Sequence, residues 1–250
     1  MNQTDRPVPV RDGVAIVVGA GDATGGALAR RFAREGLKTV ICRRDAEKLE
    51  TLADEIRKAG GSAWPRGCDA RCEEEVIALF DWAEAELGPV EVAIFNVGGN
   101  VRAPFREIDA KKFFKVWEMA CLAGFLTLRE AARRMVPRGR GTIIATGASA
   151  SRKGYAGGAM FASAKFALRG LTQALAREVG AQGIHVAHVV IDGAIDTEFI
   201  RTMFPERYEL KDREGLLQPE AIADIYWQIH CQPRTAWTHE TELRPWIESW

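Results

Sequence analysis

The sequence lacks the features that mark secreted, membrane-spanning and nucleic-acid-binding proteins. Residues 1–13 contain no apolar run of the kind that a signal peptide carries. No segment approaches the ~18 consecutive apolar residues that a membrane-spanning helix needs. The 34 basic and 34 acidic residues cancel, so the overall charge does not favour nucleic acid as a partner. We therefore expect a cytoplasmic protein that binds neither membranes nor nucleic acids.

Cysteine and histidine are also scarce, with five and four residues respectively. Cys68 and Cys72 are four residues apart, but no cluster of histidines accompanies them to complete a zinc site. We therefore expect reduced, mostly buried thiols and no metal centre.

What the sequence does contain is a regular alternation of apolar runs with stretches of helical periodicity. The apolar runs predict strands at 14–18, 37–42, 90–95, 141–146 and 184–191, with a further short strand ending near Asp69. The periodic stretches predict a helix that ends near Glu35, one that runs from a cap at Asp45 to Ala59, one that ends before Gly88, and two that span about 109–136 and 158–181.

Continuous apolar strands are typical of a parallel sheet that is buried on both faces. Together with the alternation of strand and helix, they predict an α/β fold: a doubly wound Rossmann-type parallel sheet of about seven strands with helices on both faces. No repeat or linker divides the chain, so we expect residues 1–250 to form a single dinucleotide-binding domain. The polar segment 198–217 has no clear period, and we expect it to be a mobile lid over the site.

A glycine-rich turn, VGAGDATGG, joins the first predicted strand to the first predicted helix. Glycines in such a turn let the backbone approach a pyrophosphate, whose charge is stabilised by the amino terminus of the helix. A side chain at Gly25 would then occupy the place of the pyrophosphate and leave the fold itself intact. The position of the turn, between a first strand and an amphipathic helix, favours a dinucleotide site over an ordinary tight turn.

In these features the chain resembles the short-chain dehydrogenase/reductase family over nearly its whole length. The family's T-G-x-x-x-G-x-G loop corresponds to residues 18–25, which makes the candidate cofactor-binding residues Gly19, Gly21, Ala23, Thr24 and Gly25. Further family positions follow in the expected order: Asp69 at the adenine contact, Asn96 and Gly98 in the N-N-A-G element, Lys165 on the helix after the fifth strand, and Gly193, Ile195 and Thr197 in the P-G-x-x-x-T element. The resemblance implies binding of a nicotinamide dinucleotide.

The end of the second strand bears on which nicotinamide dinucleotide is used. An acidic residue at this place bonds the ribose hydroxyls of NAD, whereas an arginine accommodates the 2′-phosphate of NADP. Here Cys42 is followed by Arg43 and Arg44. Asp22 and Asp45 are negative charges that count against NADP. The arginines nevertheless favour NADP, with NAD as the alternative, because a guanidinium group is suited to phosphate.

The resemblance also implies a catalytic set of tyrosine, lysine, serine and asparagine, and three of these are missing. Phe161 stands at the tyrosine position, Ala148 at the serine position and Cys121 at the asparagine position, so only Lys165 remains. Phenylalanine has no proton to transfer, and positioned proton transfer is typically worth ~10²–10⁴ in rate. The family's standard mechanism therefore cannot operate with these residues.

Two nearby hydroxyl groups could substitute for the missing ones. Tyr155 lies in the glycine-rich loop 147–158, where it is either a proton donor or an aromatic wall of the pocket. Ser149 could face the site if the chain turns after the fifth strand. The candidate catalytic residues are therefore Lys165, Tyr155 and Ser149, and His188 is better explained as a structural residue.

Two functions remain open at this point. The first is a NADP-dependent oxidoreductase that transfers hydride between NADP(H) and a small carbonyl or alcohol substrate through a modified proton-transfer site. The alternative is a catalytically inactive NADP(H)-binding sensor or scaffold that keeps Lys165 only for the nicotinamide ribose. By analogy with the family we expect a homodimer or homotetramer. Tryptophans near the carboxyl terminus could dock onto a neighbour or onto the domain itself: Trp227, Trp237, Trp246 and Trp250.

Overall fold

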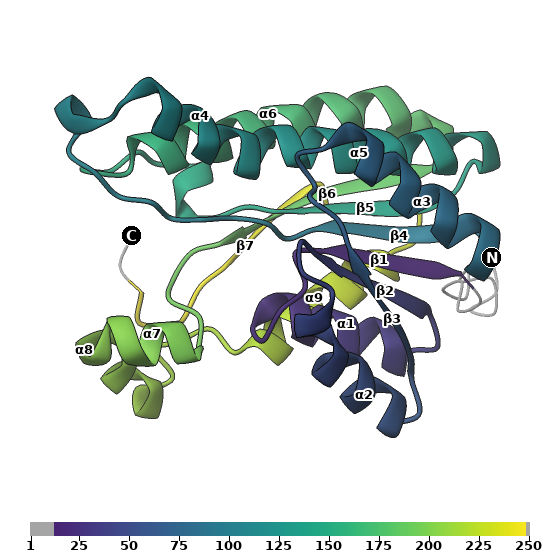
Figure 1. Cartoon of the computed structure of the whole chain (residues 1–250), viewed down its shortest axis with the longest axis horizontal. Coiled ribbons are helices and arrows are strands. Elements are labelled where there is room, and N and C mark those ends of the chain that lie inside the picture. Colours follow the sequence, from purple (N-terminus) through teal and green to yellow (C-terminus); the bar gives the residue numbers. More distant parts are fainter. Residues whose placement is uncertain (1–12, 249–250) are drawn as a thin grey trace.

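The computed structural model describes residues 13–248, and a parallel sheet of seven strands forms its centre (Figure 1). The strand order is β3-β2-β1-β4-β5-β6-β7, and each neighbouring pair is parallel. The strands are β1 Val14–Val18, β2 Lys38–Arg43, β3 Ser62–Gly67, β4 Val90–Phe95, β5 Gly141–Thr146, β6 Ile184–Ile191 and β7 Glu240–Leu243. This order confirms the predicted doubly wound Rossmann-type fold.

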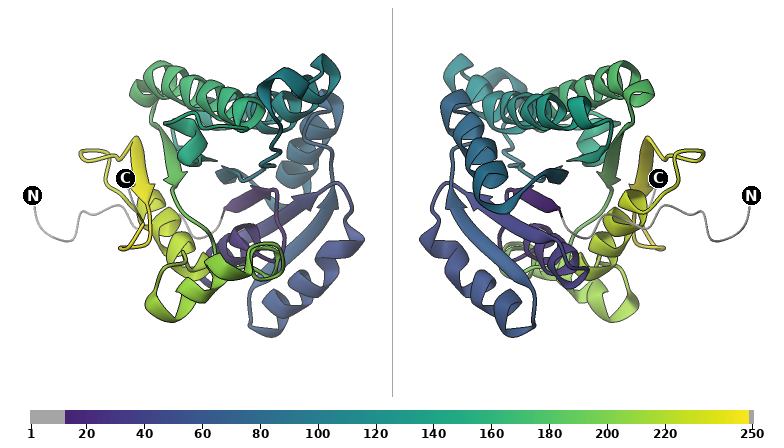
Figure 2. Two further views of the ribbon diagram at one scale, coloured as in Figure 1. Left: turned by 90° about the vertical axis from the view of Figure 1, so that its left-hand side faces the viewer. Right: turned by 90° about the vertical axis from the view of Figure 1, so that its right-hand side faces the viewer.

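Helices cover both faces of the sheet (Figures 1 and 2). One layer contains α1 Thr24–Arg34, α2 Glu50–Lys58 and α9 Pro219–His230, and the other contains α3 Glu73–Leu87, α4 Ala110–Trp117, α5 Ala123–Met135 and α6 Ala159–Val179. Each layer encloses its own apolar cluster. Ile16 of β1 belongs to one cluster and its neighbour Val17 to the other. The central strand β1 is apolar throughout because successive side chains enter opposite cores.

The carboxyl ends of the strands, on the left of Figure 1, lead into the segments that carry the predicted site residues. The turn after β1, the loop after β4, the loop 147–158 after β5 and the segment after β6 all begin at this edge. In an open parallel sheet, ligands bind outside this edge. The fold therefore brings together residues that lie far apart in the sequence.

Two predicted helices differ in detail from the observed ones. The helix expected over 109–136 begins after Asp109, whose carboxylate accepts a hydrogen bond from the Lys112 backbone N–H (2.7 Å), but a π-helical segment, Glu118–Leu122, separates α4 from α5. The cap predicted at Asp45 is wrong. A 3₁₀ turn over Glu47–Leu49 precedes α2, and the Asp45 carboxylate pairs with Lys48 instead (3.3 Å).

The segment 198–217 is more regular than we expected. It contains α7 Glu198–Met203, α8 Pro205–Tyr208 and a 3₁₀ turn over Glu209–Arg213. The Thr197 hydroxyl accepts from the Ile200 backbone N–H (3.2 Å), so a side-chain cap starts α7 in a sequence without an apolar period. The segment is therefore largely helical although its sequence has no apolar period, and its mobility stays a prediction.

Most of the cysteines are buried, and two of the carboxyl-terminal tryptophans pack against other residues of the domain. All five cysteines are reduced thiols; Cys42, Cys68 and Cys121 are buried, and Cys72 and Cys231 are half-buried. Trp227 packs on Phe32 (ring centroids 5.5 Å apart) and Trp237 stacks on His185 (4.8 Å). Trp246 is exposed, and Trp250 lies outside the described residues. Trp227 and Trp237 therefore dock onto the domain itself.

Residues 13–248 contain neither a candidate membrane-spanning helix nor a candidate metal site. None of the helices in this range is both long and apolar enough to cross a membrane. Over the same range, no three side chains of His, Cys, Asp or Glu are grouped so that they could hold a metal ion.

Candidate functional site

The turn after β1 is held tightly against the neighbouring strands. The backbone N–H groups of Gly19 and Ala20 both donate to the Cys42 carbonyl (2.9 and 3.0 Å), and the Asn96 side-chain amide donates to the Gly19 carbonyl (3.2 Å). Gly19 has φ +91°, and a Cβ there would lie 2.7 Å from the Asn96 carbonyl oxygen. The first glycine of the turn is thus required by the fold itself.

The glycines of this turn have different surroundings. A Cβ on Gly25 would lie 2.3 Å from the Gly19 carbonyl oxygen, so a side chain there collides with the turn before any ligand is considered. The expectation that a side chain at Gly25 would affect only the pyrophosphate is therefore wrong. Gly21 has no atom within 4 Å of its Cβ position and leaves open space instead. Close approach of a ligand is better assigned to Gly21.

The amino terminus of α1 has polar groups that the protein leaves unused. The Ala23 carbonyl accepts from the N–H groups of Gly26 and Ala27, but no side chain caps the helix and its first turn has no acidic residue. The Thr24 hydroxyl is buried and has no hydrogen-bond partner among the described residues. A buried unpaired hydroxyl beside free N–H groups fits a pyrophosphate, whose oxygens would accept from both.

The two arginines after β2 are similarly unpaired. Within residues 13–248, neither the Arg43 nor the Arg44 side chain forms a hydrogen bond or an ion pair, although the charge of Arg44 helps to lower the pKa of Asp69. Asp45, by contrast, is neutralised by Lys48. Arg43 is half-buried, and both Arg44 and Asp22 are exposed. The positive charges at the end of β2 are therefore available to a phosphate.

Other predicted cofactor residues lie along the same edge of the sheet. The Asp69 carboxylate, two residues beyond β3, is bound by the Arg71 guanidinium (2.5 Å), which lowers the pKa of Asp69 to about 2. Gly98 lies beside Lys165, with its Cβ position 3.6 Å from Nζ. After β6, the segment from Gly193 (φ +152°) through Ile195 leads into Thr197, the cap of α7. The structure thus places all the predicted cofactor residues at one edge, and their role stays a prediction.

Lys165 on α6 is the centre of the candidate catalytic site. Its ammonium group donates to the carbonyls of Thr146 (2.8 Å) and Val97 (3.1 Å), and the residue is only 3% exposed. Burial is the main cause that lowers the pKa of Lys165 to about 8, and no carboxylate pairs with it among the described residues. A buried ammonium group held only by neutral carbonyls retains hydrogen-bonding capacity for a ligand.

The positions of the missing hydroxyls form a small apolar cluster next to Lys165. Phe161 and Ala150 are buried in it, and Ala148 and Tyr155 pack against it. The Lys165 Nζ lies 5.8 Å from the Phe161 ring centroid. Among the side chains of this cluster only Tyr155 carries a hydroxyl, and Ser149 and Ser151 lie in the turn directly after β5.

Tyr155 is brought to this cluster by the loop 147–158. Its hydroxyl donates to the Asn100 side-chain carbonyl (2.9 Å), and the Arg102 guanidinium lies over its ring at 5.2 Å. Ser149 is half-buried at the first position of a 3₁₀ turn, Ser149–Ser151, so the chain does turn directly after β5. Asn100 and Arg102 gave no signal in the sequence, because only the fold of two separate loops places them against Tyr155.

Cys121 and His188 are better explained as packing residues. Cys121 is buried in the π-helical segment, and burial raises the pKa of its thiol. The His188 ring pairs through Nδ1 with Glu240 on β7 (3.0 Å), and Glu240 is held by Arg169 (2.6 Å). Burial lowers the pKa of His188 to about 4, so the ring is neutral. Neither group has the exposure that a proton donor to a substrate needs.

Comparisons with known proteins agree with this geometry. The sequence profile of a family described as short chain dehydrogenase matches residues 13–207. The chain is 29% identical over 228 residues to a 7alpha-hydroxysteroid dehydrogenase from Escherichia coli (strain K12), covering 89% of this chain and 88% of that protein.

Solved structures give the same result. A short-chain dehydrogenase from Rhodopseudomonas palustris has a TM-score of 0.82 and 45% identity, with 94% of this chain and 100% of that chain covered. A metagenomic short-chain oxidoreductase in complex with NADP has a TM-score of 0.82 and 26% identity, with 96% and 100% covered.

Proposed function

Since this chain belongs to the short-chain dehydrogenase/reductase family and is an oxidoreductase that uses NAD(P), we propose that it transfers hydride between NADP(H) and a small carbonyl or alcohol compound, with Tyr155 as the proton donor. One observation supports this proposal above the others. The Tyr155 ring packs against the cluster of Ala148 and Phe161, beside the buried ammonium group of Lys165. A hydroxyl is therefore present near the place from which the family's own hydroxyls are missing.

The residues at the carboxyl edge fit a dinucleotide. The open space at Gly21, the unpaired Thr24 hydroxyl and the uncapped start of α1 would hold the pyrophosphate. Arg43 and Arg44 would bind the 2′-phosphate, which is the basis for preferring NADP over NAD. Gly19, Ala23, Gly25, Asp69, Asn96, Gly98, Gly193, Ile195 and Thr197 complete the proposed cofactor site. The bound nicotinamide supplies the hydride.

Lys165 and Tyr155 have different parts in the proposed chemistry. Lys165 keeps a positive charge beside the reacting region at neutral pH, since the pKa of its buried ammonium group is about 8. The Tyr155 hydroxyl now donates to Asn100, and a substrate oxygen would take the place of Asn100 as its acceptor. Ser149, at the turn after β5, would orient that oxygen.

The assembly and location of the protein are further parts of the proposal. An apolar groove on the outer side of α4–α6 is lined by Trp117, Phe125, Leu171 and Ala174, among others. Phe125, which lines the groove, is exposed. We infer that a second copy covers it in a cytoplasmic homodimer or homotetramer, and that residues 1–250 act as one domain in each copy.

The proposal is tested by NADPH oxidation against a panel of aldehydes, ketones and quinones. The native protein should turn over at least one compound, and Tyr155→Phe should lower that rate by about 10²-fold, because the proton donor is lost while the ring is kept. The matched control is Tyr208→Phe, a half-buried tyrosine of α8 outside the cluster.

The double variant Ala148→Ser with Phe161→Tyr separates the two functions considered above. Tight NADPH binding without turnover in the native protein, together with turnover in the double variant, would indicate the sensor or scaffold. Native turnover that is unaffected by Tyr155→Phe would refute Tyr155 as the donor.

A further inference from the structure

Arg102, in the loop between β4 and α4, is held in place without a carboxylate partner. Its guanidinium carbon lies 5.2 Å from the centroid of the Tyr155 ring. Nearby, the Ala103 N–H donates to the Gly157 carbonyl (3.1 Å) and Tyr155 donates to Asn100 (2.9 Å), so the two loops are fastened together. Within residues 13–248, Arg102 forms no hydrogen bond or ion pair, and its side chain is exposed.

Three other cations near the carboxyl edge are neutralised by acidic side chains. Arg152 pairs with Glu242, Arg201 pairs with Glu198 (2.6 Å), and Lys211 pairs with Asp196 (3.0 Å). Arg102 differs because the ring beneath it is neutral. A guanidinium group that lies over an aromatic ring uses its face and keeps its in-plane N–H groups free. Those N–H groups match the two oxygens of a carboxylate.

The position of Arg102 relates it to the site of reaction. The Tyr155 ring contacts Arg102 and also packs against the cluster of Ala148 and Phe161, where the carbonyl or alcohol group is expected. Arg102 is therefore one side chain away from that group. An anionic group on the substrate, a few bonds from the reacting carbon, would reach it.

We propose that Arg102 recognises a carboxylate on the substrate, so that the preferred substrates are oxo acids or hydroxy acids rather than neutral carbonyl compounds. This inference rests on the proposed function, because it places the reacting group at the cluster beside Tyr155. The same arginine could serve only to fix the Tyr155 ring. That role would need no ligand and would give no preference for charge.

Binding measurements separate these two roles without depending on turnover. Calorimetry in the presence of NADP⁺, which cannot reduce a ketone, would compare levulinate and para-acetylbenzoate with their neutral methyl esters. In the native protein the acids should bind about tenfold more tightly than the esters, the gain that one charge-assisted contact provides. The preference should fall as salt is raised, since Arg102 is exposed.

The variants assign the preference to one residue. Arg102→Met should abolish it, Arg102→Lys should keep part of it, and Tyr155→Phe should keep it because the ring remains. Arg106→Met is the matched control, an exposed arginine of the same segment without an aromatic partner, and should leave the preference unchanged.

Equal affinity for acid and ester in the native protein, a preference that survives Arg102→Met, or failure of every probe to bind would overturn the inference. A charge preference without turnover would instead contradict the proposed function and leave the role of Arg102 standing. Turnover of neutral ketones with no charge preference would contradict the role of Arg102 and leave the proposed function standing.

Discussion

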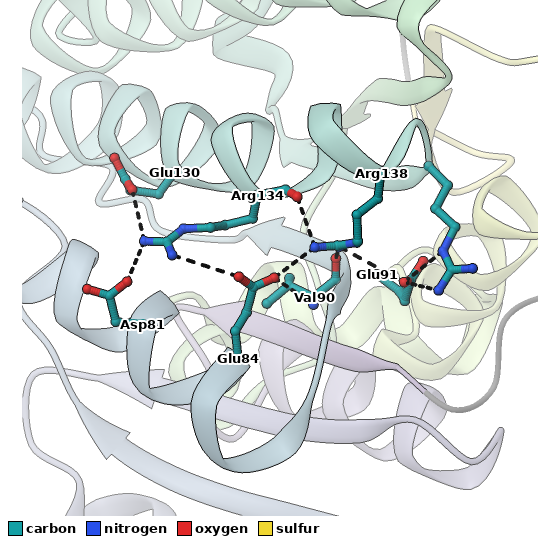
Figure 3. A network of polar contacts seen from close by, with 8 residues as sticks. Asp81, Glu84, Val90, Glu91, Glu130, Arg134 and Arg138 are labelled. Carbon is teal, nitrogen blue, oxygen red and sulfur yellow. Dashed lines mark hydrogen bonds and ion pairs between the residues drawn. The ribbon is translucent and has the colours of Figure 1, made fainter.

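The two ends of the sheet differ in how their cations are paired with carboxylates. Towards the amino ends of β4 and β5, arginines and acidic residues form a closed network (Figure 3). Its ion pairs include Arg134 with Asp81 (2.6 Å), Arg138 with Glu84 (2.8 Å) and Arg140 with Glu91 (2.9 Å). At the carboxyl edge, Arg43, Arg44, Arg102 and Lys165 have no carboxylate partner within the described part of the chain.

This difference suggests that the charged groups at the amino end stabilise the fold, whereas those at the carboxyl edge bind a ligand. At the amino end the buried carboxylate of Glu91, in a residue only 2% exposed, is matched by arginines, which is required because an unpaired buried charge is costly. At the carboxyl edge the Thr24 hydroxyl and the Lys165 ammonium group are buried with less than their full set of partners. Such groups lower the stability of the free protein and are retained where a ligand completes them.

The largest effect is expected at Lys165, where stability and function should change in opposite directions. Below pH 8 the ammonium is charged in both states and its burial is a cost, so Lys165→Met should raise the free energy of unfolding at pH 7 by about 1 kcal/mol. The gain should shrink as pH rises from about 8 towards the unfolded pKa. Turnover should fall by ~10²-fold or more.

Denaturant titrations at pH 7 and pH 10, beside NADPH oxidation rates, check both expectations. Lys58→Met, an exposed residue of α2, is the matched control and should change neither quantity. A less stable Lys165→Met protein at pH 7 would contradict the view that burial of the Lys165 ammonium group destabilises the folded protein.

The opposite result is expected at the closed network. Glu91→Gln should lower the free energy of unfolding by about 2 kcal/mol, because it removes the charge that Arg140 and Arg138 share. The NADPH affinity of the folded protein should not change. Glu86→Gln, on the exposed side of α3, should leave stability unaltered. Loss of NADPH affinity in the folded Glu91→Gln protein would contradict the view that the network at the amino end affects stability alone.

A pH-dependent effect concerns two histidines, His188 of β6 and His230 at the end of α9. Burial lowers the pKa of both His188 and His230 to about 4, below their unfolded value, so both are neutral in the folded protein. Their contribution to stability is complete above pH ~6.5 and is lost as pH falls towards 4, by roughly 3 kcal/mol for each histidine. His230→Gln should reduce the slope of this decline in thermal unfolding measured between pH 7 and 4. An unchanged slope would show that His230 does not contribute to the loss of stability at low pH.

Much of the fold could be predicted because its central strands are continuous apolar runs. Those at 14–18, 90–95, 141–146 and 184–191 coincide with β1, β4, β5 and β6. The strand β7 was not located, because its sequence ETEL is polar and half-buried at the edge of the sheet. The pairing of its Glu240 with His188 depends on the register of that edge, which no local pattern encodes.

The candidate site could be predicted in part for the same reason. The glycine turn and Lys165 follow strands that the sequence identifies, so their meeting at one edge was predictable. The surroundings of Tyr155 were not, since Asn100 and Arg102 come from a loop without a period. The distinction between Gly21 and Gly25 depends on backbone atoms brought close only by the folded turn.

The central claim is that the unpaired cations at the carboxyl edge bind NADP(H), and a calorimetric titration tests it most directly. The native protein should bind NADPH at least about tenfold more tightly than NADH, because two arginines meet the additional phosphate. The double variant Arg43→Gln with Arg44→Gln should weaken NADPH to the affinity of NADH and leave NADH nearly unchanged. Equal affinities in the native protein, or equal losses for both nucleotides in the variant, would contradict the account.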